Sequence, residues 1–247
     1  MTLASWIIIG ISIVAGSFLS GVFGMAGGMV VVGVLLIYFD VATAMILFSI
    51  IQLAANGWRA AQWWSFVRWD IIWRYCLGGL VAFAILRVIE FVPDKALVYL
   101  LLGLMPFAVE ALPASWRPSI EWRGVPFVTG IFTTIIQFIS GVGGPFLDIF
   151  FQKSALDRKT TVATKAVAQT ASHILRFVYF VSIIGFGTGL EPLPVLAAIA
   201  LAIGGTMLAP YVIERMTDHG FRQWSRVIIA AMGIVFIIRA GWLYWQG

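Results

Sequence analysis

Two stripes of polar side chains interrupt long apolar stretches of this chain, and their chemistry suits an anion. On a helix each stripe shares one face, because its members are spaced i, i+4 and i+7. They are Gln52, Asn56 and Arg59 in one stretch and Gln169, His173 and Arg176 in another. Amides beside a cation suit an oxyanion with several acceptor oxygens, so we expect all six to bind such a ligand. For the two arginines, which lie nearer the run ends, the alternative is snorkelling to the interface.

Two glycine pairs each precede an apolar run that is too short to cross a bilayer. Gly27 and Gly28 stand before about eleven apolar residues, and Gly143 and Gly144 before Pro145 and six or seven more. A spanning helix needs about 20 residues. A short helix that starts after the glycines turns free N–H groups and its positive dipole end toward the break, where an anion can bind. The alternative is that the glycines only allow tight helix packing.

Two titratable side chains inside apolar runs are candidates for coupling anion movement to an ion gradient. Asp148 follows shortly after Pro145, and an acidic residue at this depth is a functional candidate by default. It carries a coupling proton or cation, or it pairs with Lys153 or Lys165. His173 is either a proton carrier or a partner in a helix–helix hydrogen bond.

The elements that must position these side chains are helices in a membrane. The 247 residues are 61% hydrophobic and 11% charged, against about 25% charged in a soluble domain. Short polar connections separate ten apolar runs, which predict an all-α, polytopic integral membrane protein. The runs cover residues 6–23, 29–39, 41–64, 70–90, 96–109, 124–139, 145–151, 159–186, 194–213 and 222–245.

The same composition excludes several classes of function. With nearly the whole chain in the bilayer, no room remains for a soluble catalytic domain, and the chain has no P-loop, HExxH or Ser/His/Asp constellation, so we expect no enzyme. A single cysteine, Cys76, leaves no intrachain disulfide and no thiolate metal site; we expect neither metal nor cofactor. The net charge of +5 comes from basic residues beside the runs, which is a topology signal and not a nucleic-acid site.

The positions of Lys and Arg predict how the runs are oriented. Most of them fall into four regions, which the positive-inside rule places in the cytoplasm. These regions are 58–74, 111–123, 152–159 and 213–226. In this arrangement both termini lie outside.

The linker 111–123 divides the membrane domain into a first transmembrane repeat, 1–110, and a second, 124–247. In both, the runs follow the order long, short, long, long, long. We expect the first two runs to form a broken or re-entrant hairpin and the other three to cross fully. Three crossings reverse the orientation of the second repeat, which gives the inverted repeats of many secondary transporters.

A shift of 117 residues supports the duplication. It superimposes three polar pairs, which are Asp40 and Asp157, Gln52 and Gln169, and Arg59 and Arg176. A shift of 116 brings the first glycine pair onto the second.

A family resemblance rests on the two glycine motifs. Gly24-Met25-Ala26-Gly27-Gly28 and Gly141-Val142-Gly143-Gly144-Pro145 each precede a half-length run, and in this duplicated arrangement the chain resembles the sulfite exporter TauE/SafE family. The family pattern usually has a glycine run followed by a proline, and the first copy has Met29 at the place of that proline. The resemblance implies export of sulfite, organosulfonates or other small sulfur-containing or organic anions across the cytoplasmic membrane, driven by an ion gradient.

We therefore expect a multi-pass transporter of the inner (cytoplasmic) membrane that exports a small anion by alternating access. The anion would lie between the two hairpin tips, held by the backbone of the glycine pairs and by Gln52 and Gln169. The alternative is a passive anion channel that uses the same tips as a filter. The expected partners are the small anionic substrate and the lipid bilayer; a homodimer is left open, and nucleic acid is not expected.

Overall fold

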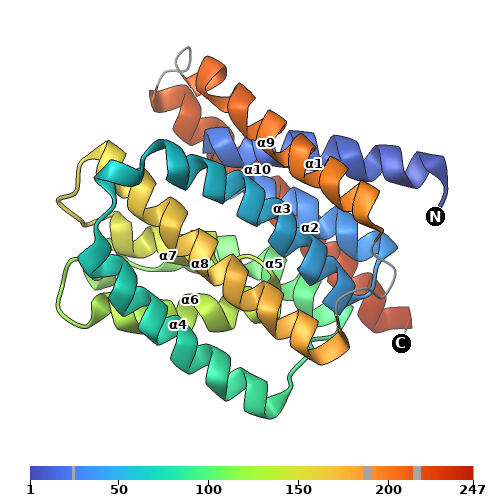
Figure 1. Cartoon of the computed structure of the whole chain (residues 1–247), viewed down its shortest axis with the longest axis horizontal. Helices are drawn as coiled ribbons and strands as arrows, with labels where there is room; N and C mark the ends of the chain where they lie inside the picture. The colour runs from blue at the N-terminus through green and yellow to red at the C-terminus, as the bar shows by residue number, and fades with distance from the viewer. Residues whose placement is uncertain (24–25, 186–190, 214–217, 247) are drawn as a thin grey trace.

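Ten α-helices account for most of the computed structural model, which describes residues 1–23, 26–185, 191–213 and 218–246 (Figure 1). The first half forms α1 (Leu3–Phe23), α2 (Ala26–Tyr38), α3 (Val41–Gln62), α4 (Trp69–Ile89) and α5 (Lys95–Ala111). The second half forms α6 (Val125–Ser140), α7 (Gly144–Phe151), α8 (Arg158–Ile184), α9 (Pro192–Ile213) and α10 (Asp218–Gln246). Each predicted apolar run corresponds to one of these helices, and the all-α prediction is confirmed within the described ranges.

Within the described ranges, six helices are long and apolar enough to cross a membrane. They contain the segments Leu3–Val22, Val41–Gln62, Trp69–Ile89, Arg158–Ile184, Pro192–Ala209 and Val227–Gln246. The chain is therefore a multi-pass membrane protein. α1 belongs to this set, whereas α5, for which we expected a full crossing, does not, because it has only 17 residues.

The helices that carry the two polar stripes begin in the same way. Asp40 is the N-cap of α3, and its carboxylate accepts the backbone N–H of Thr43 at 2.9 Å. Asp157 is the N-cap of α8 and accepts the backbone N–H groups of Lys159 and Thr160. Such caps satisfy N–H groups that the first helical turn leaves free. Both stripes therefore start from a capped helix end at the same distance along the helix.

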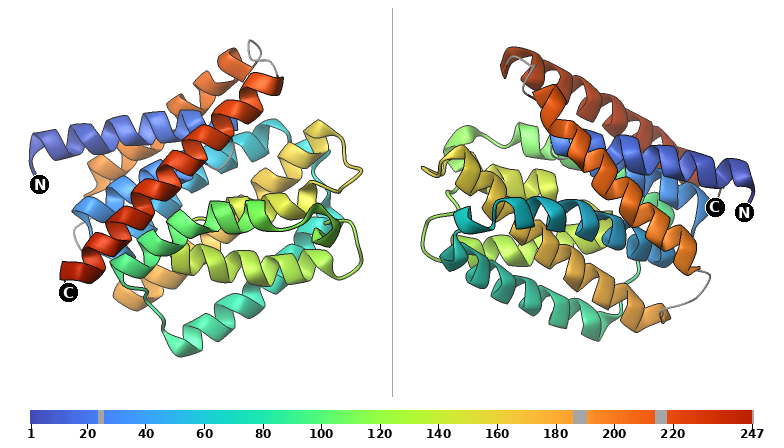
Figure 2. Two further views of the ribbon diagram at one scale, coloured as in Figure 1. Left: turned by 180° about the vertical axis from the view of Figure 1, so that it is seen from behind. Right: turned by 45° about the horizontal axis from the view of Figure 1, so that its top comes forward.

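The halves are interleaved, because the principal helix contacts join one half to the other. α3 packs against α8, α5 against α10, α1 against α9 and α4 against α6, as Figures 1 and 2 show from three directions. Small residues allow the closest of these approaches: a Cβ on Gly78 would lie 1.9 Å from the Phe127 carbonyl oxygen, and one on Gly130 would lie 2.0 Å from that of Tyr75. Close backbone approach at glycine is typical of helix packing in membranes.

Several basic connections meet at one end of the bundle, opposite the two termini (Figure 1). Lys153 donates to the Ser115 carbonyl at 3.2 Å, and the N–H of Ala155 donates to the Glu121 carboxylate at 2.7 Å. Arg68 lies 3.8 Å from the same carboxylate. Three of the four basic regions are thus together, as the topology prediction requires; within the fourth, residues 214–217 lie outside the described part of the chain.

Candidate functional site

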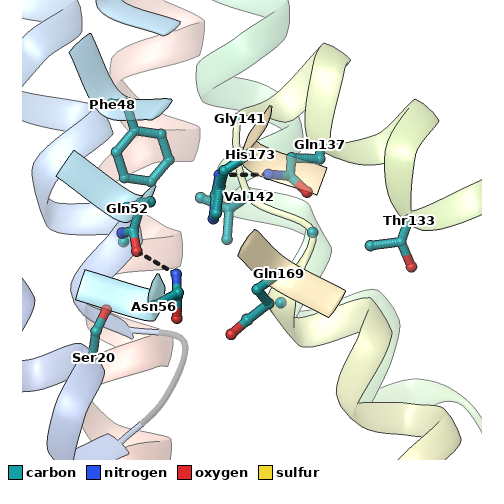
Figure 3. Close-up of a pocket in the computed structure, with 13 residues that line it drawn as sticks. Ser20, Phe48, Gln52, Asn56, Thr133, Gln137, Gly141, Val142, Gln169 and His173 are labelled. Atoms are coloured by element: carbon teal, nitrogen blue, oxygen red, sulfur yellow. Dashed lines mark hydrogen bonds between the residues drawn. The ribbon is translucent and has the colours of Figure 1, made fainter. Parts of the chain in front are cut away.

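A pocket lies where the helix interruptions of both halves meet the middle of α3 and α8 (Figure 3). The empty space, including its part open to solvent, is about 430 Å³. Seven predicted site residues line it, namely Gly28, Gln52, Asn56, Gly143, Gly144, Gln169 and His173. Six further residues complete the lining, namely Ser20, Phe48, Thr133, Gln137, Gly141 and Val142. Residues from both halves therefore build one site.

The two polar stripes face each other across this pocket. In Figure 3, Gln52 and Asn56 project from α3 toward Gln169 and His173 of α8. The Asn56 amide donates to Gln52 Oε1 at 3.0 Å, one helical turn away. Gln137 of α6 contacts the ring of His173, with 2.7 Å between its Nε2 and Nδ1 of the imidazole. Asn56 and His173 are thus each held by a hydrogen bond to another polar side chain.

The second helix interruption depends on a glycine conformation. Gly141 ends α6 with φ +80°, a left-handed value that favours glycine, and its N–H donates to the Gln137 carbonyl. α7 then begins at Gly144, with Pro145 in its first turn. Because Gly144 lines the pocket, the N-terminal end of α7 borders it.

Two glycines leave room for neighbouring side chains at the pocket. A Cβ on Gly28 would lie 3.1 Å from Gln52 Nε2 and 3.3 Å from the Phe48 ring. A Cβ on Gly143 would lie 2.9 Å from the Thr133 methyl group. The open backbone at these positions forms part of the pocket wall.

Gly27 has a different position from its neighbour and does not line the pocket. A Cβ there would lie 1.7 Å from the Gly16 carbonyl oxygen, so Gly27 brings α1 and α2 into contact. This is the packing role that we considered as the alternative. Gly24 and Met25 of the first glycine motif lie outside the described residues.

Arg176 is fully buried behind the pocket lining. Its Nε donates to the Ser49 hydroxyl at 2.8 Å, one terminal nitrogen donates to the Gly141 carbonyl, and its guanidinium carbon lies 4.5 Å from the centre of the Phe48 ring. The other terminal nitrogen has no hydrogen-bond partner in the described structure, and no ion pair joins Arg176 to a described carboxylate.

Arg59 occupies the corresponding place in the first half and also lies outside the lining. It donates to the Ser20 carbonyl at 3.4 Å, near the end of α1. Both arginines therefore bind carbonyls at the ends of the helices that precede the two interruptions, where a cation compensates the negative dipole end. Direct contact between either arginine and a ligand stays a prediction.

Asp148 forms a salt bridge with Lys165 of α8 and does not line the pocket. Its side chain is 22% exposed and that of Lys165 is 25% exposed. Pairing with Lys165 was one of the alternatives for this carboxylate. A coupling role for Asp148 stays a prediction.

We did not predict from the sequence the polar residues that α1 and α6 contribute to the pocket. Thr133, Gln137 and Ser140 have the same i, i+4, i+7 spacing that pointed to the other two stripes, so this signal was present. The shift of 117 residues also relates Ser20 to Gln137 and Asn56 to His173. Of these two pairs, we had not selected Ser20 and Gln137 from the sequence, and the shift relates them to each other.

The chemistry of the lining is neutral and rich in hydrogen-bond donors. It contains four side-chain amides or imidazoles from α3 and α8, one more amide from α6, and two hydroxyls, but no acidic residue. Among the described residues, no group of three or more His, Cys, Asp and Glu could hold a metal ion. Donors without carboxylates favour an anionic ligand.

The chain matches the model of a known protein family. The family described as Sulfite exporter TauE/SafE matches residues 8–236, which include both interruptions and every residue of the pocket. No curated protein and no solved structure matches the chain. Because the family match covers more than nine-tenths of the sequence, the chain belongs to the sulfite exporter TauE/SafE family.

Proposed function

We propose that this protein exports a small oxyanion, namely sulfite, an organosulfonate or a related sulfur-containing or organic anion, across the cytoplasmic membrane. Its family is one of sulfite and anion exporters. The observation that best supports the proposal is the donor-rich pocket between the halves, which contains no acidic side chain. The amides of Gln52 and Gln169 and the backbone at Gly28 and Gly144 would bind the anion.

Arg176 adds an electrostatic argument for a negatively charged ligand. A buried cation without a paired anion is costly, and Arg176 has no described carboxylate partner. It lies against Phe48 and binds the carbonyl of Gly141, both of which belong to the pocket lining. An anion in the pocket would offset this charge without displacing the arginine from its present hydrogen bonds.

We propose alternating access between inverted repeats as the mechanism. Each helix of the first half has a counterpart five places later, so that α1 corresponds to α6 and α4 to α9. When every helix is exchanged for its counterpart, the contact of α1 with α9 becomes the contact of α6 with α4, which is also present. The contacts of α3 with α8 and of α5 with α10 are unchanged by the exchange. This is the pattern that two-fold related halves would have. Rocking of one half on the other would open the pocket to each side in turn.

Sulfite counterflow in proteoliposomes tests the function. The purified protein is expected to catalyse saturable uptake of labelled sulfite that unlabelled internal sulfite accelerates. Gln169→Leu should weaken it, whereas Gln62→Leu, at an exposed position near the end of α3, should not. Flux that does not saturate and follows only the membrane voltage would identify the passive channel. Absence of flux for sulfite, organosulfonates and small carboxylates would overturn the proposal.

A further inference from the structure

We infer that Gln137 is a positioning residue that selects the tautomer of His173 and so presents an N–H donor to the bound anion. The inference rests on the proposed function for the identity of the ligand. It concerns α6, from which our sequence analysis took no site residue. The observation is the contact between the Gln137 amide and the imidazole inside the pocket lining (Figure 3).

The proton position follows from the hydrogen bond. Gln137 Nε2 lies 2.7 Å from His173 Nδ1. An amide nitrogen is a donor only, so Nδ1 accepts and carries no proton. A neutral imidazole then carries its proton on Nε2. The His173 side chain lines the pocket. Its Nδ1 has a hydrogen-bond partner in the described structure, whereas its Nε2 has none there.

The orientation of Gln137 is constrained by the helix interruption. Its side chain is buried, with 2% exposure. A Cβ on Gly143 would lie 3.2 Å from the Gln137 Cβ and 3.0 Å from the Thr133 carbonyl oxygen, so the backbone of the interruption rests on this turn of α6. Gln137 is therefore held between the interruption and α8. A movement of the backbone between α6 and α7 would therefore be transmitted to His173 through the Gln137 amide.

The surroundings of the imidazole favour its neutral form. Phe48 contacts the His173 ring edge to face, with 6.0 Å between ring centres, and the Arg176 guanidinium lies against the same Phe48 ring. Arg176 carries a positive charge with no described carboxylate partner. A second cation beside it in a buried region would be repelled. The imidazole therefore acts as an uncharged donor.

The tautomer decides which ligand atoms the second half of the site accepts. With the proton on Nε2, the imidazole offers a donor to the unprotonated oxygens of an anion. With the proton on Nδ1, it would offer a lone pair, which repels the same oxygens. Gln137 thus favours an anion that presents a bare oxygen to α8. The first half needs no such residue, because Asn56, at the place of His173, has no tautomers.

Nitrogen-15 NMR of the full-length protein tests the tautomer directly. The chain has two histidines, so His219→Gln leaves His173 as the single labelled residue. Ring shifts, together with couplings to the ring C–H groups, show which nitrogen carries the proton. We expect Nε2–H in this background and a mixture of tautomers in Gln137→Leu. In Gln137→Glu we expect Nδ1–H, because the carboxylate accepts a hydrogen bond from that N–H group. A proton on Nδ1 in the background protein would overturn the inference, as would an unchanged Nε2–H tautomer in Gln137→Leu. If Gln137→Leu does not fold, the His173 tautomers measured in the background protein and in Gln137→Glu test the inference.

Sulfite titration of the same samples separates this inference from the proposed function. Gln137→Leu is expected to bind sulfite about tenfold more weakly, the loss of one hydrogen bond. Gln52→Leu is the matched control: it should also weaken binding but leave the tautomer of His173 unchanged. If the background protein shows Nε2–H but does not respond to sulfite, the proposed substrate fails while the tautomer assignment stands. Unchanged sulfite affinity in Gln137→Leu would contradict the positioning role.

Discussion

The pocket faces of α3 and α8 are alike in position and different in chemistry. On α3, Gln52 and Asn56 are hydrogen bonded to each other and neither can titrate. On α8, Gln169 and His173 occupy the places 117 residues later, and His173 has its partner on another helix, at Gln137 of α6. One half thus offers a fixed amide pair. The other offers a titratable ring whose partner also contacts the interruption before α7.

This difference separates two tasks that a coupled transporter must perform. An amide pair binds an anion in the same way at any physiological pH. An imidazole can change its charge in this range. An anion bound beside His173 would offset the repulsion from Arg176 that otherwise keeps the ring neutral, so proton uptake can accompany anion binding. The two halves would then share binding while only the second half responds to protons.

The largest effect is expected from closing the pocket at its glycines. Gly28→Val and Gly144→Val should each abolish sulfite counterflow, because a branched side chain blocks approach to the backbone. Even a single Cβ on Gly28 would lie only 3.1 Å from Gln52 Nε2. Gly204→Val serves as the control, since Gly204 is exposed and nothing lies within 4 Å of its Cβ position. Normal flux in either pocket variant would place the anion elsewhere.

Making the two halves alike should remove coupling and keep exchange. His173→Asn gives α8 the amide that α3 has. We expect counterflow to persist and proton-driven accumulation to be lost, both measured in the same proteoliposomes. Asp148→Asn is the parallel variant for the other coupling candidate, although it also breaks the salt bridge with Lys165. If both variants retain full proton-driven accumulation, neither residue is the carrier and protons are not coupled through these sites.

A smaller and equal effect is expected from the two glutamines that the halves share. Gln52→Ala and Gln169→Ala should each weaken sulfite binding by about 1–3 kcal/mol, the range for a hydrogen bond to a charged group. Calorimetric titration measures both. Comparable losses would indicate that both glutamines contact the anion. A loss in one variant alone would show that a single half binds it, and unchanged affinity in both would remove the site from these faces.

The smallest effect concerns the helix caps and stability only. Asp40→Ala should lower the melting temperature by about 2–4 °C, and Asp40→Asn should largely restore it.

The hydrogen bonds from the side chain and backbone of Thr160 hold the pKa of Asp157 below its ordinary value. The ionised Asp157 cap therefore contributes its full stabilisation above the ordinary aspartate pKa. This stabilisation is lost as the pH falls through the lowered pKa of Asp157 in the folded protein. The melting difference between wild type and Asp157→Ala should be constant from pH 6 to pH 8 and shrink in acid; a difference that grows in acid would contradict this assignment.

Much of the fold could be predicted because hydrophobic runs bounded by charges specify spanning helices. The ten runs became ten helices, and the glycine motif at 141–144 became the interruption between α6 and α7. Gln52, Asn56, Gln169 and His173 could be found because amides and imidazoles inside such runs are costly unless they face a cavity.

Other features depend on contacts that spacing alone does not determine. Arg59 and Arg176 share a helix face with the pocket residues, but their long side chains reach backbone carbonyls beside it. Gly27 and Gly28 are adjacent, yet one packs against α1 and the other lines the pocket. Gln137 belongs to a predicted run, and its partner His173 is 36 residues away.

In the mechanism that we propose, one anion binds between α3 and α8, in contact with both halves. Selenite, a heavier analogue of sulfite, locates such an ion by anomalous scattering in crystals of the protein. We expect one anomalous peak within hydrogen-bonding distance of Gln52 and Gln169, and its loss in the Gln52→Ala, Gln169→Ala double variant. A peak that contacts one half only, or a peak that persists in the double variant, would contradict it.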